Sequence, residues 1–156
     1  MKLRRVVPAT ADTVHASVCL GDDTEGALLD SLGDVAGKRV LLLGAHVGIM
    51  CELIRRGCLE VTELELNERL DVCAVDLAIV PTIASADAAA CAIAHARRAL
   101  VPCGRTLVRA TVDPTGRRGR AIERILRLHG FSLVGVYRAK NRAVFVAKLA
   151  LSSVPS

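Results

Sequence analysis

The stretch GKRVLLLGAHVGIMCELIRRGCLEVTELELN, residues Gly37–Asn67, decides the fold. It begins with the apolar run Val40–Leu43, which is too short for a helix and therefore predicts a buried strand. A turn with two glycines follows, then apolar residues at helical spacing, and Gly57 stands where a helix C-cap glycine is expected. A second predicted strand, Val61–Leu66, carries Glu65 near its end. Strand, glycine turn, helix, strand and acid are the outline of a nucleotide-binding unit.

Each part of this unit has a physical role in holding a nucleotide. Gly44 and Gly48 let the turn close and let a cofactor approach the backbone, while the next helix presents free N–H groups at its N-terminus. Ala45 and His46 lie inside the same turn. The carboxylate of Glu65 can accept hydrogen bonds from two ribose hydroxyls.

Length and composition indicate one domain with an aliphatic core. The chain has 156 residues, enough to bury roughly two-thirds of the surface that its unfolded form exposes. Hydrophobic residues make up 52% and aromatic residues only 2%, so the core must consist of Ala, Val, Leu and Ile. The mean hydropathy of +0.41 is high for a small chain. We therefore expect an apolar face that a homodimer or a protein partner covers.

The sequence favours a cytoplasmic protein without a membrane segment. Its basic N-terminus is not followed by the apolar run of a signal peptide. The most apolar region, Val72–Ala96, is interrupted by Asp76, Pro81 and Asp87, so we expect no membrane span. The six cysteines lack paired spacing, which is typical of buried thiols rather than of a disulfide framework.

Charge is distributed unevenly along the chain. Residues 1–76 hold 8 basic and 13 acidic residues, a net charge of −5, and residues 77–156 hold 13 basic and 3 acidic residues, a net charge of +10. The basic half permits a nucleic-acid partner. A solvated arginine-rich face is the interpretation that we favour, because the chain has too few aromatic residues to stack bases.

Outside the central unit the pattern predicts alternating helices and strands. We interpret residues 1–21 as an N-terminal arm, 22–150 as a single domain and 151–156 as a loose tail. The expected elements are a short strand Val14–Leu20, a helix Asp23–Val35, a strand Val75–Val80 followed by Pro81, a helix capped by Ser85 or Asp87 and running to Leu100, a turn Pro102–Gly104, a strand Thr106–Thr111, a helix containing Ile122–His129, and an antiparallel pair Phe131–Tyr137 and Ala143–Leu149.

This order of elements resembles the class I S-adenosylmethionine-dependent methyltransferases. VLLLGAHVG is similar to their first motif, a strand followed by G-x-G-x-G, and VTELELN to the second, with its ribose-binding acid. RRALVPCGRTLV, Arg97–Val108, resembles their L-x-P-G-G-x-L, and Ile122–Leu149 resembles their last helix and closing strand pair. The resemblance spans Lys38–Leu149. It implies a three-layer Rossmann-like α/β sandwich whose mostly parallel sheet ends in an antiparallel C-terminal pair.

The resemblance also implies S-adenosylmethionine as cofactor. The residues that would bind it are Gly44, Ala45, His46, Gly48, Glu65, Leu66 and Pro81.

Two departures from the family pattern affect this site. The family's middle glycine is His46 here, so a side chain stands where the cofactor normally meets backbone. Only about ten residues separate Glu65 from the strand at Val75. The family usually places a helix, a strand and an adenine-contacting acid in that interval. We therefore predict that the third strand is missing and that the sheet is open at that edge.

The sequence identifies no catalytic residue. Methyl transfer needs mainly positioning, sometimes with one general base, for which His46 and Asp76 are candidates. His46 could act on a substrate, bond to the cofactor carboxylate or fill the space of a lost ligand. Cys91 and His95 share a helix face but have no second pair at ligand spacing, so we expect no metal.

Three functions agree with these patterns. The first is a small methyltransferase acting on an unidentified acceptor. The second is a degenerate, non-catalytic methyltransferase-like module that serves as an interaction or regulatory subunit. An NAD-type Rossmann protein ranks last: GAHVGIM is similar to the glycine turn of short-chain dehydrogenases, but Lys140 follows Tyr137 by three residues rather than the four of their Tyr-x-x-x-Lys.

Overall fold

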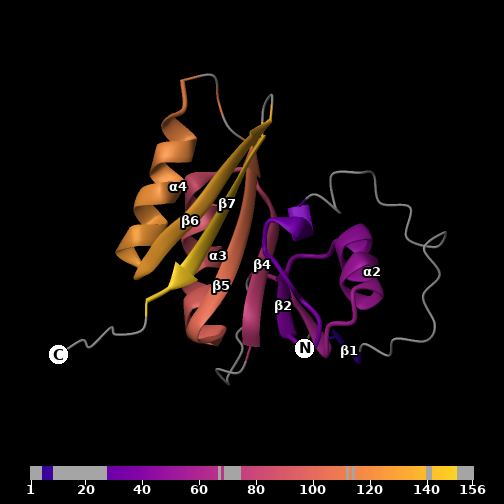
Figure 1. The fold of residues 1–156 in the computed structure, drawn as a ribbon. Coiled ribbons are helices and arrows are strands. Elements are labelled where there is room, and N and C mark those ends of the chain that lie inside the picture. Colours follow the sequence, from indigo (N-terminus) through magenta and orange to yellow (C-terminus); the bar gives the residue numbers. More distant parts are fainter. Residues whose placement is uncertain are drawn as a thin grey trace.

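The computed structural model describes residues 5–8, 28–66, 68, 75–111, 113, 115–139 and 142–150. These residues form a seven-stranded sheet with helices on both faces, the predicted three-layer α/β architecture (Figure 1). The elements are β1 (Arg5–Pro8), β2 (Arg39–Leu43), α2 (Val47–Arg55), β3 (Glu60–Leu64), β4 (Val75–Ile83), α3 (Ala86–Ala99), β5 (Leu100–Thr111), α4 (Arg117–Leu128), β6 (Phe131–Ala139) and β7 (Arg142–Leu149).

The strand order is β1-β3-β2-β4-β5-β7-β6. The four central strands β3, β2, β4 and β5 are parallel to one another. β7 runs antiparallel to β5, and β6 runs antiparallel to β7. The mostly parallel sheet with an antiparallel C-terminal pair is therefore confirmed.

The neighbour of β3 at the edge of the sheet comes from the N-terminus. β1 pairs antiparallel with β3, from Arg5 opposite Glu63 to Pro8 opposite Glu60. The predicted open edge is wrong, because β1 supplies backbone hydrogen-bond partners there. Between β3 and β4 the described residues contain no strand. The predicted strand Val14–Leu20 lies outside the described residues.

The helix predicted for Asp23–Val35 ends earlier than expected. Residues 28–30 are helical, while residues 23–27 lie outside the described part. The amides of Leu32 and Gly33 donate to carbonyls three residues back, at 3.1 and 3.2 Å, and Gly33 then takes a left-handed φ of 85°. That conformation ends a helix. The predicted apolar stripe is nevertheless buried: Leu28, Leu29, Leu32 and Val35.

β4 continues through Pro81, where the sequence predicted its end. Pairing with β2 extends only to Ile79, and the register with β5 shifts between Val80 and Ile83. Pro81 lies in this gap, where its missing N–H costs no regular ladder bond.

The predicted turn Pro102–Gly104 is a bulge inside β5. The strand begins with Leu100 opposite Val75, and the next pair is Leu77 with Arg105. The intervening stretch therefore has no regular partner. Within it Cys103 has a φ of 66°, the one positive value among the described non-glycine residues. The family pattern has glycine at this position, which avoids the strain.

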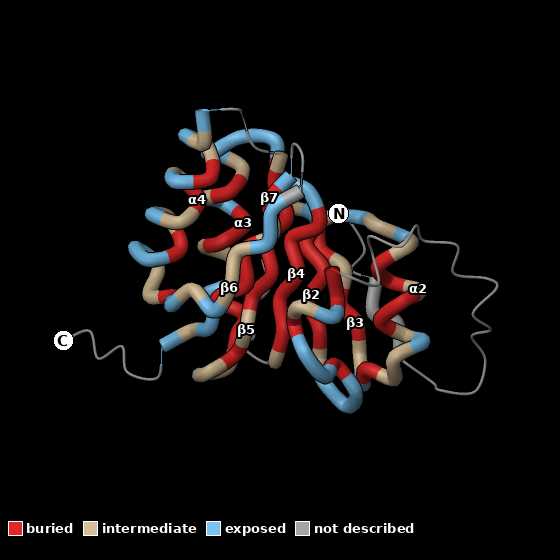
Figure 2. Tube along the Cα trace, turned by 45° about the horizontal axis from the view of Figure 1, so that its top comes forward, coloured by how far each residue is buried: buried red, intermediate tan, exposed pale blue. Residues whose placement is uncertain are grey.

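The two faces of the sheet carry separate core clusters (Figure 2). α3 and α4 cover one face, packing around Phe145 of β7. α2 and the segment Leu28–Val35 cover the other. The sheet thus places the glycine turn before α2 at the edge where the parallel strands end.

Candidate functional site

The predicted cofactor residues meet at the carboxyl edge of the parallel strands. Gly44 follows β2, Glu65 follows β3, and Pro81 lies near the end of β4. The amide of Gly44 donates to the carbonyl of Leu64 over 2.7 Å, which joins the glycine turn to the end of β3. Glu65 is exposed and Leu66 is half-buried. In open α/β sheets ligands bind outside this edge.

The glycine turn is open above its first residue. Gly44 has a φ of 100°, and a Cβ built on it would meet no atom within 4 Å. Glycine is therefore required by the backbone conformation and not by crowding. Ala45 is exposed, and Gly48 is half-buried in the first turn of α2.

His46 is the N-cap of α2, a role that the sequence did not predict. Its Nδ1 accepts a hydrogen bond from the backbone N–H of Ile49 over 3.2 Å. The imidazole thus satisfies one of the helix's free amides, as shorter polar side chains do at most N-caps.

Arg109 is a site residue that sequence reasoning missed. It lies on β5 and is only 7% exposed. Its Nε donates to the carbonyl of Pro81 over 2.7 Å, and its Nη2 lies 3.3 Å from Nε2 of His46. An arginine between Val108 and Ala110 in a strand expected to be buried was the available signal.

The two contacts of His46 require opposite tautomers. Accepting from Ile49 needs an unprotonated Nδ1, and accepting from Arg109 needs an unprotonated Nε2. A neutral imidazole has only one unprotonated nitrogen. With His46 as N-cap, its Nε2 carries the proton, and Nη2 of Arg109 lies 3.3 Å from it. Both groups can donate a hydrogen bond to a carboxylate.

Asp76 lies at the opposite edge of the sheet, which rules it out as a base beside the glycine turn. Its Oδ2 accepts from the backbone N–H of Arg39 over 2.9 Å and lies 3.5 Å from Nε of the same residue. Both residues stand at the beginning of their strands. This location could have been predicted, because Asp76 stands at the beginning of the predicted strand Val75–Val80, and the beginnings of parallel strands lie opposite their carboxyl ends.

Two cavities also lie toward the amino side of the sheet. One of about 480 Å³ is bounded by Leu32–Asp34, Lys38, Asp76–Leu77 and the bulge at residues 101–105. Another of about 490 Å³ lies between Asp30–Val35 and the end of α2. None of the predicted cofactor residues lines either cavity.

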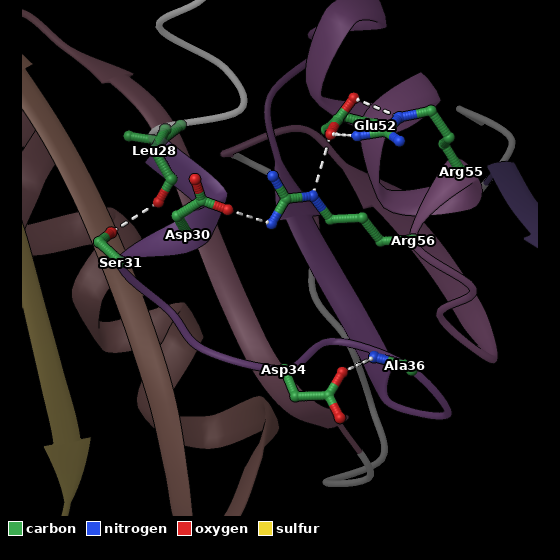
Figure 3. Close-up of polar contacts among 8 residues, drawn as sticks. All are labelled: Leu28, Asp30, Ser31, Asp34, Ala36, Glu52, Arg55 and Arg56. Atoms are coloured by element: carbon green, nitrogen blue, oxygen red, sulfur yellow. Dashed lines mark hydrogen bonds and ion pairs between the residues drawn. The ribbon is translucent and has the colours of Figure 1, made fainter. Parts of the chain in front are cut away.

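An ion-pair cluster holds the segment before β2 against α2 (Figure 3). Arg56 bonds Glu52 of α2 through Nε over 2.9 Å and Asp30 through Nη1 over 2.8 Å. Arg55 also bonds Glu52. Hydrogen bonds from Arg55 and Arg56 lower the pKa of Glu52, although partial burial opposes the shift. Glu52 is therefore a structural carboxylate.

The cysteines in the described part of the chain form no reactive or metal-binding site. Cys58 is fully buried, and burial raises the pKa of its thiol to about 11, which makes it unreactive. Cys91 is exposed, and its Sγ lies 3.5 Å from the carbonyl oxygen of Leu66. In the described ranges no three His, Cys, Asp or Glu side chains gather to hold a metal ion. No helix among those ranges is long and apolar enough to cross a membrane.

Comparisons with known proteins identify the fold. No model of a protein family matches the sequence, and no curated protein does. Solved structures do match. An O-methyltransferase family protein from Burkholderia thailandensis has a TM-score of 0.68 at 15% identity, over 88% of this chain and 58% of that one. An S-adenosylmethionine-dependent methyltransferase from Mesorhizobium loti has a TM-score of 0.66 at 16% identity, over 83% of this chain and 99% of that one. A ribosomal protein L11 methylase from Lactobacillus delbrueckii has a TM-score of 0.64 at 15% identity, over 84% of this chain and 81% of that one.

The chain has the class I methyltransferase fold. Within this fold, β2 and β3 are the first two strands of the family pattern, and β4 to β7 are its last four. β1 occupies the place of the third strand with reversed direction. The class I methyltransferase fold therefore keeps its strand positions here although one strand comes from another part of the chain.

Proposed function

We propose that the chain is an S-adenosylmethionine-dependent methyltransferase that binds its cofactor at the carboxyl edge of β2, β3 and β4. The observation that carries the proposal is the meeting of Gly44, Glu65 and Pro81 at that edge, on a fold shared with solved S-adenosylmethionine-dependent methyltransferases. When bound, the cofactor supplies a methyl group on an activated sulfonium. The methyl acceptor is not identified by the residues at the edge.

The ribose end of the cofactor fits the residues present. Glu65 is exposed at the end of β3, and its carboxylate accepts hydrogen bonds from hydroxyls. The space above Gly44 is open, so a ligand can approach the turn. Ala45 and Gly48 belong to the same turn and the helix start that follows it, and Leu66 follows Glu65 in the chain.

The amino-acid end of the cofactor fits in a different way from the family pattern. His46 occupies the place of the middle glycine, but together with Arg109 it presents two donors. We infer that this pair receives a carboxylate, which releases His46 from its tautomer conflict. In this role His46 positions the ligand and is not a base.

The alternative is a non-catalytic module that has lost the cofactor. It is favoured by one observation: the contacts from Pro81 through Arg109 to His46 bridge the edge above β4. In that case the imidazole and guanidinium fill the space that a ligand would take.

Titration calorimetry with S-adenosylmethionine and S-adenosylhomocysteine tests the proposal. We expect heat of binding with both ligands and a loss of affinity of about tenfold or more for Glu65→Ala, because a charged hydrogen-bond acceptor is removed. Glu60→Ala is the matched control, a glutamate at the amino end of the same strand. Absence of heat at millimolar ligand in a folded sample would contradict the proposal.

His46→Gly separates the two functions. It restores the family's glycine and keeps an acceptable N-cap residue, so the fold should tolerate it. If His46 holds the carboxylate, affinity falls by roughly tenfold. If His46 only fills a vacated pocket, affinity rises, and this outcome would support the non-catalytic module.

A further inference from the structure

α4 presents an arginine face to solvent. Arg117, Arg120, Arg124 and Arg127 are all exposed, while Ile122 and Leu126 on the opposite side are fully buried. At about 100° per residue the four arginines fall within an arc of about 80°, and they extend along about 15 Å of helix. The buried side fixes the rotation of the helix, so these four side chains necessarily point away from the core.

Little on the helix itself neutralises this arginine face. Glu123 is the one acid of α4, and in the described part of the chain it makes no ion pair. Asp113, just before the helix, accepts from Thr115 and from the backbone N–H of Arg118. These hydrogen bonds from Thr115 and Arg118 lower the pKa of Asp113, so it stays ionised at the N-terminus of α4. There its charge complements the helix dipole.

The end of α3 adds positive charge near the C-terminal end of α4. α3 packs beside α4 in the same layer (Figure 1). Its last turn carries the exposed Arg97 and Arg98. A Cβ built on Gly130, just after α4, would lie 4.0 Å from Nε of Arg97. Burial and the neighbouring Arg97 lower the pKa of His129. Arg97 therefore lies near the C-terminal end of α4.

We propose that the arginine face of α4 binds the phosphate backbone of a nucleic acid. Arginine suits phosphate because its planar fork forms two parallel charge-assisted hydrogen bonds. Phosphates repeat along a strand, as the arginines do along the helix. Base stacking is not needed for this mode, so the scarcity of aromatic residues does not oppose it.

A protein or membrane partner fits the face less well. Stable protein interfaces have an apolar core with aromatic anchors, and membrane-surface helices bury a large apolar face. Here the exposed large apolar residue of α4 is Leu128 at the end of the helix, 77% exposed. The rest of its exposed face is guanidinium and polar.

Salt-dependent fluorescence anisotropy tests the proposal, with the full chain and labelled single-stranded RNA or duplex DNA of mixed sequence. With four phosphate contacts, log Kobs should fall with log salt at a slope of about −3 to −4, and affinity should drop about 100-fold between 50 and 200 mM salt. Single strands release fewer counterions per contact, so the same four contacts should give a slope of about −3 with single-stranded RNA and nearer −4 with duplex DNA. A flat salt dependence, or absence of binding at low salt, would overturn the proposal.

The variant Arg124→Gln/Arg127→Gln locates the contacts. We expect affinity near 100 mM salt to fall by roughly one to two orders of magnitude and the slope to decrease by about 2. Glutamine is a good helix former, so thermal melting should remain near that of the parent.

The matched control is Arg142→Gln/Lys148→Gln, which removes the same net charge. Both residues are exposed on β7 and alternate with Val144 and Val146, so they face the side of the sheet that carries α2. We expect little change in the slope. An equal loss in both double variants would reduce the effect to net charge and overturn the assignment to α4. Tighter binding to anionic vesicles or poly-glutamate than to nucleic acid would also overturn it.

Discussion

The two faces of the sheet are covered in different ways. On one face, α3 with fourteen residues and α4 with twelve pack mainly through apolar side chains. On the other face, α2 has nine residues and is joined by the turn-rich segment Leu28–Val35. The ion pairs of Arg56 hold these two pieces together.

This difference separates scaffold from site. Long helices bury a continuous apolar surface and resist local opening, whereas short segments held by polar contacts open more easily. The glycine turn, Glu65 and His46 belong to the second face or its edge. The face that the short helix α2 covers therefore contains the candidate cofactor site, and the face that α3 and α4 cover is the scaffold that supports it.

The largest expected effect concerns the face under α3 and α4. Phe145 of β7 is fully buried and belongs to the core cluster that α3 and α4 cover. Phe145→Ala should lower the free energy of unfolding by about 4 kcal/mol, because it removes a large side chain and leaves a cavity. Urea denaturation measures it.

Leu53→Ala is the counterpart on the face under α2, where Leu53 is also fully buried. We expect a loss of about 3 kcal/mol, or less if the short pieces collapse into the cavity. A larger loss for Leu53→Ala than for Phe145→Ala would contradict the assignment of scaffold and site.

A smaller effect is expected at the ion pairs. Glu52→Gln should lower the free energy of unfolding by about 2 kcal/mol at neutral pH, because two arginines lose a charged partner. The folded-state pKa of Glu52 is below its ordinary value of 4.5, so its contribution is present above that pH and disappears as pH falls through the folded value.

The gap in stability between the parent and Glu52→Gln should therefore narrow below about pH 4.5. Denaturation at a series of pH values measures it. Glu123→Gln is the control, a glutamate of α4 with no ion pair in the described ranges, and its effect should be small at every pH. A gap that widens in acid would refute the role of Glu52.

The smallest effect is expected at the bulge of β5, where strain is local. Cys103→Gly should raise the free energy of unfolding by about 1 kcal/mol, because glycine accepts the φ of 66° without a Cβ clash. Cys103→Ala keeps the Cβ and should give no gain. Thermal melting of both variants is sufficient, and equal stabilisation would show that the thiol and not the backbone is the cause.

The order of the elements from β2 to β7 could be predicted because each followed a local pattern. The run Val40–Leu43, the capping glycine Gly57 and the stripe Ile122–Leu126 are each decided by neighbours within a few residues. The end of β4 at Ile83 could not be predicted, since proline normally ends a strand. The register gap and the Arg109 bond that accommodate Pro81 involve another strand.

The sequence by itself determined the α/β class and the antiparallel end of the sheet. Only the tertiary structure decided two further features: β1 beside β3, and Arg109 against His46. Periodicity reports which face of an element is buried, and it is set by residues close in sequence. Which strand end meets which side chain depends on contacts across the sheet, which no local pattern records.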